Sequence, residues 1–520
     1  MAFTLILMVA LAYLCARPFI VYFYDAKGLR KYPNLNPLSG ITSLAYVWEH
    51  SNNFRTRRLY LKHRKHPVIR VGPNVLSFAD VRAIKDIYGH GTPCRKDDVY
   101  SLTVGSHAHI LNTVDREDHN RKRRMLSHAF ATRNLERWEF KIVDKIGKLI
   151  TQLDRRCTAP LSDRHHVNSE DLTLDFTLWS NLFTIDAIAD LALSEQLNLL
   201  DSGTDVVKVD NIPSLKFIDS LHGGNYITSL FVGAANWFAV LKALSRIVSP
   251  LFRAQWDHGR NYGRIVSALT GKRLEKHQRG GQLGDLFACL MEDNKGNARG
   301  LERGELEAEV NVLLDAGSDT TAIALTHALY YLIKTPHALA TLRKEVAGAF
   351  SEEPIARYAS VKNLPYLKAC LEESLRLSPP VSRGLERRTP PEGMRIMGEE
   401  IPGDVGVSVP VYVAHRDPAI FPEPALYRPE RWLESEENVK QMREAFVPFS
   451  TGARGCIGRN ITMIEQQLVI ATLVHRYDFA LPSDHWSLQH NEAFLLWPGP
   501  MPLKIWRRDL GSATSMRNDL

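Results

Sequence analysis

The chain has 520 residues, of which 44% are hydrophobic and 24% charged, and its formal net charge is +7. These fractions are those of an ordinary globular fold, which excludes a disordered or fibrous chain. A mild positive charge, with no basic-aromatic stripe and no zinc-ligand spacing, argues against nucleic acid as a partner. The six cysteines have no paired spacing, which favours a reducing compartment over a disulfide framework.

An apolar segment occupies the N-terminus. Residues 2–16 are almost wholly apolar, and residues 19–24 continue the run, giving about the 20 residues needed to cross a bilayer. Arg17 either snorkels to the membrane surface or marks the end of a shorter, partly interfacial helix. Basic residues follow the segment and none precedes it. This pattern is typical of an uncleaved anchor with the rest of the chain in the cytosol.

The chain divides into four parts. Pro33 and Pro37 stiffen the stretch that follows the anchor, and the last residues are polar. No internal repeat or flexible linker divides the interior, so we expect one large domain there. The predicted parts are a transmembrane anchor over 1–24, a proline-containing neck over 25–40, a globular domain over 41–508 and a polar tail over 509–520.

The globular part combines a few strands with many helices. Residues 68–78 predict two strands joined by a Gly-Pro-Asn turn, and residues 405–413 alternate like a strand. Apolar residues at helical spacing predominate elsewhere, as in residues 176–193, and predict a mainly α protein. Residues 201–212 are polar and loop-like, and an apolar, aromatic-containing run follows over 218–240.

A charged helix is predicted before residue 130. Most of its charges, including Arg121, Lys122 and Arg124, are interpreted as a solvated basic face. Such a face suits an acidic protein partner. His119 and Arg123, however, are four residues apart and therefore share one side of the helix.

A very long helix is predicted over residues 305–334, which contain no proline and carry apolar residues at helical intervals. In its middle, residues 316–321 read A-G-S-D-T-T. Glycine, aspartate and threonine are poor helix formers, and a cluster that breaks local rules is expected at a functional site. The alternative is a helix that is merely bent by its serine and threonines.

A further helix is predicted over residues 364–378, ended by two prolines. Glu373 and Arg376 share one of its faces. An exposed pair of this kind contributes only about 0.2–0.5 kcal/mol and is common. By itself this pair indicates no function.

The most specific pattern lies close to the C-terminus. The ten residues from Phe449 to Gly458 read F-S-T-G-A-R-G-C-I-G and lead into an apolar run that predicts a helix. A Cys456 thiolate at a helix start gains from the helix dipole and unpaired N–H groups, which lower its pKa. Cysteine thiolate is one of the few axial ligands of haem iron. A buried, inert cysteine is the alternative.

Three neighbours of Cys456 fit the same interpretation. Gly452 and Gly458 allow positive φ angles and a close approach of the backbone to a flat ring. Arg454 supplies a permanent cation that suits a propionate group.

This stretch resembles the haem-binding loop of the cytochromes P-450, F-x-x-G-x-R-x-C-x-G, at every fixed position. The resemblance extends over nearly the whole chain. It implies a mainly α fold with a small β lobe in a single large haem domain. The implied cofactor is haem b (iron protoporphyrin IX), with Cys456 as the axial ligand of the iron.

The resemblance also assigns roles in the other motifs. Residues 316–321 match the signature A/G-G-x-D/E-T-T, so Thr320 and Asp319 would deliver protons for oxygen activation. Gly317 would leave room for the oxygen beside the helix. His119 and Arg123 match the helical pair that holds a propionate.

Later in the chain, Arg387 is at the position of a second propionate arginine, with Arg388 as its competitor. Glu373, Arg376 and Arg431 would form a buried structural network behind the haem.

The implied activity is a monooxygenase that oxidises a medium-sized apolar organic substrate with O2. Its electrons would come from an NADPH-cytochrome P-450 reductase, because no flavin or nicotinamide segment is recognised. The sequence resembles the fungal, membrane-anchored members of the family. This resemblance implies a location in the endoplasmic reticulum membrane and a role as a tailoring enzyme in polyketide or terpenoid biosynthesis. A haem-thiolate isomerase or dehydratase and a non-enzymatic haem sensor remain as alternatives. The residues do not identify the substrate.

Overall fold

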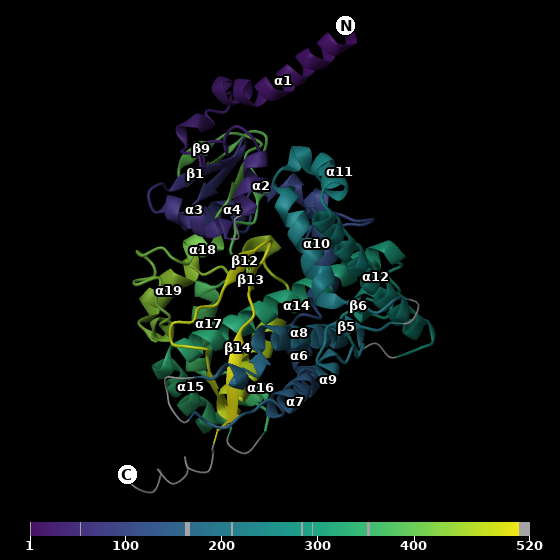
Figure 1. The fold of residues 1–520 in the computed structure, drawn as a ribbon, viewed down its shortest axis with the longest axis vertical. Coiled ribbons are helices and arrows are strands. Elements are labelled where there is room, and N and C mark those ends of the chain that lie inside the picture. Colours follow the sequence, from purple (N-terminus) through teal and green to yellow (C-terminus); the bar gives the residue numbers. More distant parts are fainter. Residues whose placement is uncertain are drawn as a thin grey trace.

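The structure is a computed structural model that describes residues 2–51, 54–161, 167–209, 212–281, 284–293, 295–350 and 354–508. The predicted polar tail over 509–520 lies outside the described residues. Helices dominate the body, and a small group of strands lies at the end from which α1 (Ala2–Tyr24) projects (Figure 1). The mainly α fold with a small β lobe is therefore confirmed.

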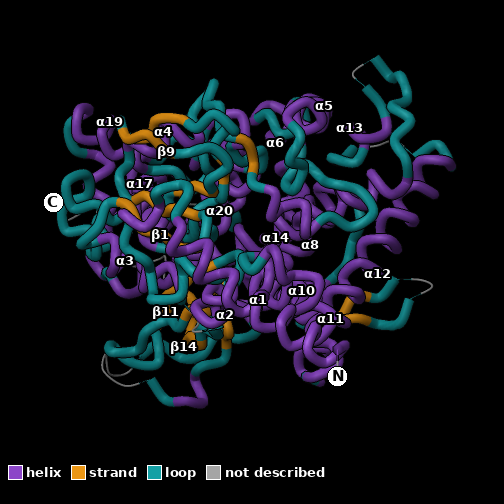
Figure 2. Tube along the Cα trace, turned by 90° about the horizontal axis from the view of Figure 1, so that it is seen from above, coloured by secondary structure: helices purple, strands orange, loops and turns teal. Residues whose placement is uncertain are grey.

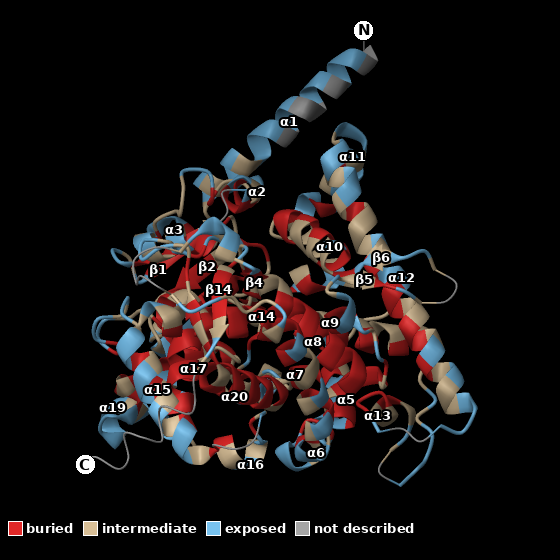
Figure 3. Ribbon diagram, turned by 60° about the horizontal axis from the view of Figure 1, so that its bottom comes forward, coloured by how far each residue is buried: buried red, intermediate tan, exposed pale blue. Residues whose placement is uncertain are grey.

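The long helix α14 (Arg303–Lys334) runs through the middle of the body (Figure 2). It packs against α8 (Phe176–Leu193), α17 (Pro365–Leu377) and α20 (Arg459–Arg476). All four helices were predicted from apolar spacing, and their facing residues form the main hydrophobic core. Figure 3 shows this core as the red centre of the molecule.

The remaining helices surround this core. In chain order they are α2 (Leu44–His50), α3 (Arg55–His63), α4 (Arg82–Tyr88), α5 (Arg116–Ser127), α6 (Thr132–Arg137), α7 (Glu139–Asp154), α9 (Leu199–Ser202), α10 (Phe217–Val232), α11 (Phe238–Val248), α12 (Pro250–Gln278), α13 (Ala288–Met291), α15 (Pro336–Ala349), α16 (Tyr358–Val361), α18 (Val411–Ala414) and α19 (Glu436–Ala445). The predicted apolar run over 218–240 thus forms α10 and the start of α11. The predicted loop over 201–212 holds the end of α9 and a short strand, and its residues 210–211 lie outside the described part.

The β lobe is a five-stranded sheet with the order β1-β2-β10-β7-β3. Its strands are β1 (Val68–Gly72), β2 (Val75–Phe78), β3 (Arg95–Lys96), β7 (Arg387–Arg388) and β10 (Gly406–Ser408). The predicted β1–β2 hairpin is present and antiparallel. The strand predicted over 405–413 is shorter, because Pro410 precedes the helix α18.

Smaller sheets complete the fold. Their strands are β4 (Leu174–Asp175), β5 (Val206–Val207), β6 (Leu215–Lys216), β8 (Met394–Ile396), β9 (Glu399–Ile401), β11 (Tyr477–Ala480), β12 (His490–Glu492), β13 (Leu496–Pro498) and β14 (Pro502–Arg507). The β12–β13 hairpin brings Trp497 beside α14, where it contacts the central motif.

The N-terminal helix α1 extends away from the body (Figures 1 and 3). Its 23 residues span about 34 Å at 1.5 Å per residue, enough for a hydrocarbon core of about 30 Å. Its exposed side chains include Ile6, Phe19 and Ile20. Among the described residues, one helix passes a test of length and hydropathy for a membrane span by itself, but this helix, α8, is 89% buried and belongs to the core.

The predicted neck is attached to the β lobe. Lys27 donates from Nζ to the carbonyl oxygen of Gly403 at 2.8 Å, and Lys31 pairs with Glu399 of β9 at 2.6 Å. Tyr32 donates to the same carboxylate at 2.8 Å. These contacts fix the start of the body relative to the end of α1.

Candidate active site

A cavity of about 1090 Å³ lies between α14, α10, the β lobe and the loop before α20. It brings together residues that are far apart in the sequence. The predicted site residues on its wall are Cys456, Arg454, Phe449, Gly458, Thr320, Gly317, His119, Arg123 and Arg387. Gly452 and Asp319 lie behind this wall.

Cys456 occupies the turn immediately before α20. Its backbone N–H donates to the carbonyl oxygen of Phe449 at 2.8 Å, which closes the loop. Burial raises the pKa of the Cys456 thiol above its usual value, while the backbone N–H groups of Gly458 and Arg459 act in the opposite direction. The N–H groups therefore lower the thiol pKa, as predicted. Loss of hydration raises it by more, so the pKa of the thiol without a bound metal is above its usual value. Coordination to a metal deprotonates such a thiol outright.

The two loop glycines differ in their backbone angles. Gly452 has the predicted positive φ angle, +70. A Cβ there would also collide with the carbonyl oxygen of Tyr88 in α4, so this glycine permits close packing between backbones. Gly458 has φ −80 and caps α20, which corrects the prediction of a positive φ angle. A Cβ at Gly458 would lie 3.9 Å from the Cys456 sulfur, an ordinary van der Waals contact.

Gly317 lets two core helices approach each other. A Cβ at this position would come within 2.6 Å of the Ile188 side chain on α8. Since the Cβ direction points toward α8, the structure gives Gly317 a packing role. Space for oxygen beside the helix stays a prediction.

Basic groups gather at one end of the cavity. Arg454 donates to the carbonyl oxygens of Val114 and Asp115 at 2.9 and 3.1 Å, and Arg123 donates to that of Gly455 at 2.7 Å. Burial, then the nearby Arg387 and Arg116, lower the pKa of Arg454 to about 10. Cations that destabilise one another in this way favour a bound anion.

Arg387 and Arg388 differ in their partners. Arg387 donates to the carbonyl oxygen of Glu386 at 3.1 Å, whereas Arg388 pairs with the Asp97 carboxylate at 2.9 Å. The charge of Arg387 is thus the less neutralised of the two.

Lys96 is a cation that the sequence analysis missed. Pairing of β3 with β7 places Lys96 opposite Arg387, and both line the cavity. Burial and the neighbouring arginines lower the pKa of Lys96 well below its usual value. No local motif marks Lys96, because a long-range strand pairing brings it to the site.

His119 also faces the basic end of the cavity. It is buried, and its Nδ1 has no hydrogen-bond partner among the described residues. Burial, then the charge of Arg454, lower its pKa to about 4, so the ring is neutral at neutral pH. The neutral ring can donate one hydrogen bond to an anion.

Lys122 lies on the same helix and was predicted to belong to a solvated basic face. This part of the prediction is wrong, because Lys122 is buried. Its side chain is 2% exposed and pairs with Glu305 and Glu309 of α14 at 2.6 and 3.0 Å. Lys122 therefore joins α5 to α14 and is unavailable to an electron donor.

The Asp-Thr pair of α14 points in two directions. Thr320 lines the cavity, and its hydroxyl donates to the carbonyl oxygen of Ala316 at 2.7 Å. Asp319 is 1% exposed and accepts hydrogen bonds from His222 Nε2 at 2.9 Å and from Trp497 Nε1 at 3.1 Å. Asp319 thus has no direct contact with outside solvent, so any proton that it delivers has to reach it through a neighbouring group.

His222 supplies the connection to solvent. Its side chain is 28% exposed and stacks on Trp497. Burial lowers the pKa of His222, but the Asp319 charge and hydrogen bond outweigh burial and raise it. Sequence reasoning missed this histidine because it reaches Asp319 from α10, 97 positions away.

A buried ion network lies outside the cavity wall. The Glu373 carboxylate accepts hydrogen bonds from Arg376 at 2.8 Å, from Arg431 at 3.0 Å and from Trp432 at 3.0 Å. The three charged side chains are fully buried. Burial alone would raise the pKa of Glu373, but the two arginines bring it below its usual value.

His415 connects this network to the cysteine loop. Arg376 donates to the carbonyl oxygen of His415 at 2.9 Å, and His415 Nε2 accepts from the N–H of Val447 at 3.0 Å. Val447 lies two residues before Phe449. The network is therefore placed to hold the loop that carries Cys456.

Most of the chain is similar in sequence to a known family. The sequence profile of the family described as Cytochrome P450 matches residues 33–505. The chain is a cytochrome P450. This P450 is 30% identical to "Benzoate 4-monooxygenase bphA" of Aspergillus niger over 92% of this chain and 93% of that protein. It is also 30% identical to "Cytochrome P450 monooxygenase efuB" of Hormonema carpetanum, over 89% and 88% of the two chains.

A solved structure agrees with the fold of this P450. The cytochrome P450DA heme domain superposes with a TM-score of 0.73 at 18% identity, covering 92% of this chain and 98% of that one. The resemblance stated from the cysteine loop is thus confirmed. Membership of this family makes the protein a haem-dependent monooxygenase, an oxidoreductase that uses dioxygen, a redox partner and an organic substrate.

The residues present fit a haem. A sulfur faces the cavity beside backbone N–H groups, and a group of cations lies at one end with a His119 nitrogen that has no hydrogen-bond partner in the described ranges. These features match a metal ligand and a binding place for two propionates.

Proposed function

We propose that the cofactor is haem b, with Cys456 Sγ as its axial ligand. Its propionates are held by His119 and by the four cations at the end of the cavity, Arg454, Arg387, Arg123 and Lys96. The observation that carries this proposal is the placement of Cys456 and Thr320 on the wall of one cavity, with these cations at its end. Haem with a thiolate ligand supplies dioxygen activation, in which one oxygen atom enters the substrate and the other leaves as water.

Protons reach the cavity through three residues of this chain. His222 takes a proton from solvent at its exposed edge and passes one from Nε2 to the Asp319 carboxylate, 2.9 Å away. Thr320, the next residue of α14, orients a proton donor at the cavity wall through its hydroxyl. The carboxylate and the hydroxyl lie on adjacent positions of a rigid helix, which keeps their relative placement fixed.

The protein is anchored in the endoplasmic reticulum membrane by α1, with its catalytic domain in the cytosol. Support comes from the apolar, exposed α1 and from α11, which exposes Val240, Leu244 and Ile247 at the same end of the molecule (Figure 3). An NADPH-cytochrome P-450 reductase supplies the electrons from the same membrane.

The substrate is a medium-sized, largely apolar organic molecule, and its oxidation is a tailoring step in fungal polyketide or terpenoid biosynthesis. Leu313, Phe494 and Leu385 on the cavity wall support an apolar substrate. The fungal origin of the relatives supports a role in fungal biosynthesis. Another such relative, "Cytochrome P450 monooxygenase astJ" of Aspergillus oryzae, is 30% identical over 92% of this chain and 94% of that protein.

Reconstitution with oxygen isotopes tests the activity. The full-length protein, NADPH-cytochrome P-450 reductase and NADPH are incubated under ¹⁸O2 with a panel of fungal polyketides and terpenoids. We expect a product that has gained one ¹⁸O atom. A product that forms equally without NADPH and carries no ¹⁸O would instead indicate an isomerase or dehydratase.

A further inference from the structure

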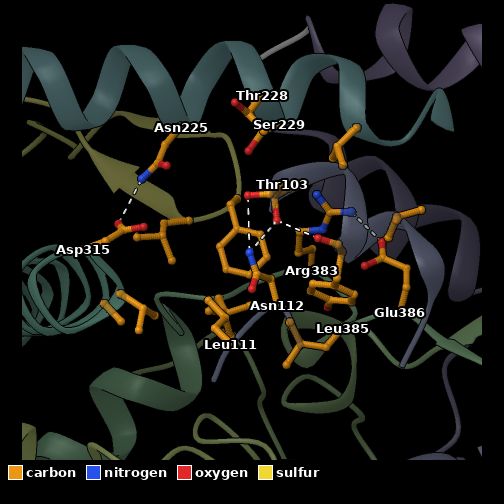
Figure 4. A pocket seen from close by; sticks show the side chains of 18 of the residues that line it. Thr103, Leu111, Asn112, Asn225, Thr228, Ser229, Asp315, Arg383, Leu385 and Glu386 are labelled. Carbon is orange, nitrogen blue, oxygen red and sulfur yellow. Dashed lines mark hydrogen bonds and ion pairs between the residues drawn. The ribbon is translucent and has the colours of Figure 1, made fainter. Parts of the chain in front are cut away.

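A polar stripe runs along α10 where this helix faces the cavity. Asn225, Thr228 and Ser229 are spaced i, i+3 and i+4 and therefore share one side of the helix. All three line the cavity, and Figure 4 shows their side chains pointing into it. Polar groups that face an apolar space lose hydration, which costs free energy unless a partner restores the hydrogen bonds.

Asp315 faces this stripe from α14. Its Oδ1 accepts a hydrogen bond from Asn225 Nδ2 at 3.0 Å across the cavity (Figure 4). Its Oδ2 has no hydrogen-bond partner within the part of the chain that the structure describes, and the residue lines the cavity. Burial, then the charge of Asp319, raise the pKa of Asp315 to about 7. Whether ionised or neutral, the carboxyl group keeps an oxygen that can accept.

Two features make this carboxyl group a place for a ligand. Asp319 pairs with His222 at 2.9 Å, whereas the Asp315 carboxyl group accepts a hydrogen bond from the neutral Asn225 amide at 3.0 Å. The second carboxyl oxygen faces the cavity, so a molecule that donates to it gains a hydrogen bond worth about 0.5–3 kcal/mol, depending on the charge of the carboxyl group. The Asn225 hydrogen bond holds the carboxyl group in place for this contact.

Thr320 lies farther along the same helix. Asp315 precedes it by five residues, a rise of about 7.5 Å along α14. Both residues line the cavity, so a substrate that donates to Asp315 can extend along the helix toward Thr320. The walls between the two are largely apolar and include Leu313 and Ala316.

We propose that Asp315, positioned by Asn225, is a specificity-determining acceptor for an O–H or N–H group on an otherwise apolar substrate. This inference rests on the proposed monooxygenase function and narrows its substrate class. The substrate is amphipathic, with its donor group at Asp315 and its apolar part extending toward Thr320.

Calorimetry on the haem-loaded protein tests the proposal with three probes. Decanol has the donor, the isomeric methyl nonyl ether lacks it, and decyltrimethylammonium has a positive charge without an N–H. We expect the wild type to bind decanol about tenfold more tightly than the ether, which corresponds to one hydrogen bond. Asp315→Leu removes the acceptor and should reduce this preference below about twofold.

Two further variants separate binding from folding. Asp315→Asn keeps an acceptor oxygen and should retain most of the preference for decanol. Asp219→Asn makes the same chemical change at an exposed position of α10 and should leave the preference intact. An unchanged preference in Asp315→Leu, or none in the wild type, would overturn the proposal.

The charged probe excludes a different explanation. The proposal is wrong if decyltrimethylammonium binds as tightly as decanol and Asp315→Asn weakens the binding of both. The site would then attract ligands through the negative charge of Asp315 and would not recognise an O–H or N–H group. Calorimetry requires neither electrons nor turnover. A failure of the monooxygenase reaction would therefore be detected separately, in the ¹⁸O2 experiment.

Discussion

The hydroxyl of Thr320 has a role that a single substitution isolates. Removing it leaves Cys456 and the basic end of the cavity unchanged, so haem binding should persist. Protons would then arrive without orientation, and electrons would be lost to hydrogen peroxide. For Thr320→Ala we expect product per NADPH to fall by about a hundredfold, the lower end of what one positioned proton-transfer group typically contributes.

The matched variant is Thr320→Ser, which keeps the hydroxyl and should retain coupling. Parallel assays of NADPH consumed, hydrogen peroxide released and product formed give the ratio of product to NADPH for each variant. Full coupling in Thr320→Ala would contradict the proposed role of this residue in proton delivery.

His222 provides a second test at the residue scale. His222→Phe preserves the ring that stacks on Trp497 but removes the nitrogen that bonds to Asp319. We expect turnover to slow and its solvent deuterium isotope effect to grow, because proton entry becomes limiting. Retained turnover with an unchanged isotope effect would show that protons take another route.

The same residues show how far the sequence predicts the site. Cys456, Asp319 and Thr320 could be located because their motifs are contiguous. Lys96 and His222 could not, since strand pairing and helix packing bring them to the site from distant parts of the chain. The error at Gly458 has a local cause: a residue that caps a helix needs no positive φ angle.

At the scale of elements, the ion network between α17 and the segment around Arg431 is the strongest candidate for a stabilising contact. Glu373→Gln would leave two buried guanidinium groups without their carboxylate. Removing one partner of a buried pair typically costs about 3–5 kcal/mol, so this variant should fold poorly and lose haem.

Arg395→Ala is the control, because Arg395 and Glu400 form an exposed pair, and such pairs contribute little to stability. Unfolding in urea, followed by the Soret band and by circular dichroism, compares the two. Equal midpoints would show that the buried network contributes no more than the exposed pair.

The sequence predicted the elements better than their contacts. The bounds of α8, α14 and α17 follow from apolar spacing and from prolines that end helices. The strand predicted over 405–413 was too long, because alternating apolar residues do not reveal where Pro410 ends pairing and α18 begins. The attachment of the neck to β9 depends on contacts between distant segments and left no local pattern.

At the scale of the whole molecule, buried histidines make stability depend on pH. Burial is the largest cause that lowers the pKa of His50, His327 and His415 to about 3 and of His63 and His490 to about 4. Unfolding returns each to about 6.5, so below this pH the unfolded state binds more protons than the folded state.

The contribution of these histidines is therefore full above about pH 6.5 and is lost as pH falls toward 4 or 3. We expect the free energy of unfolding to fall between pH 7.5 and 5.5 by on the order of 1 kcal/mol for each such histidine. Urea unfolding at both pH values measures this. Equal stability at the two would contradict it.

The membrane attachment is also a property of the whole molecule. Deleting residues 2–24 should leave the reduced carbon monoxide spectrum unchanged while shifting much of the protein from the membrane pellet to the supernatant. Some membrane affinity should remain, because α11 keeps exposed apolar side chains. A truncated protein that sediments as fully as the intact one would contradict α1 as the anchor.

The central claim is that Cys456 holds the haem iron as a thiolate. The absorption spectrum of the dithionite-reduced, carbon-monoxide-bound protein tests it most directly, with Cys456→Ser beside Cys94→Ser as a control for a buried cysteine away from the cavity. We predict the red-shifted Soret band of thiolate ligation in the wild type and in Cys94→Ser, and its loss in Cys456→Ser. A band at the position of histidine-ligated haem in the wild type, or an unchanged red-shifted band in Cys456→Ser, would contradict the account.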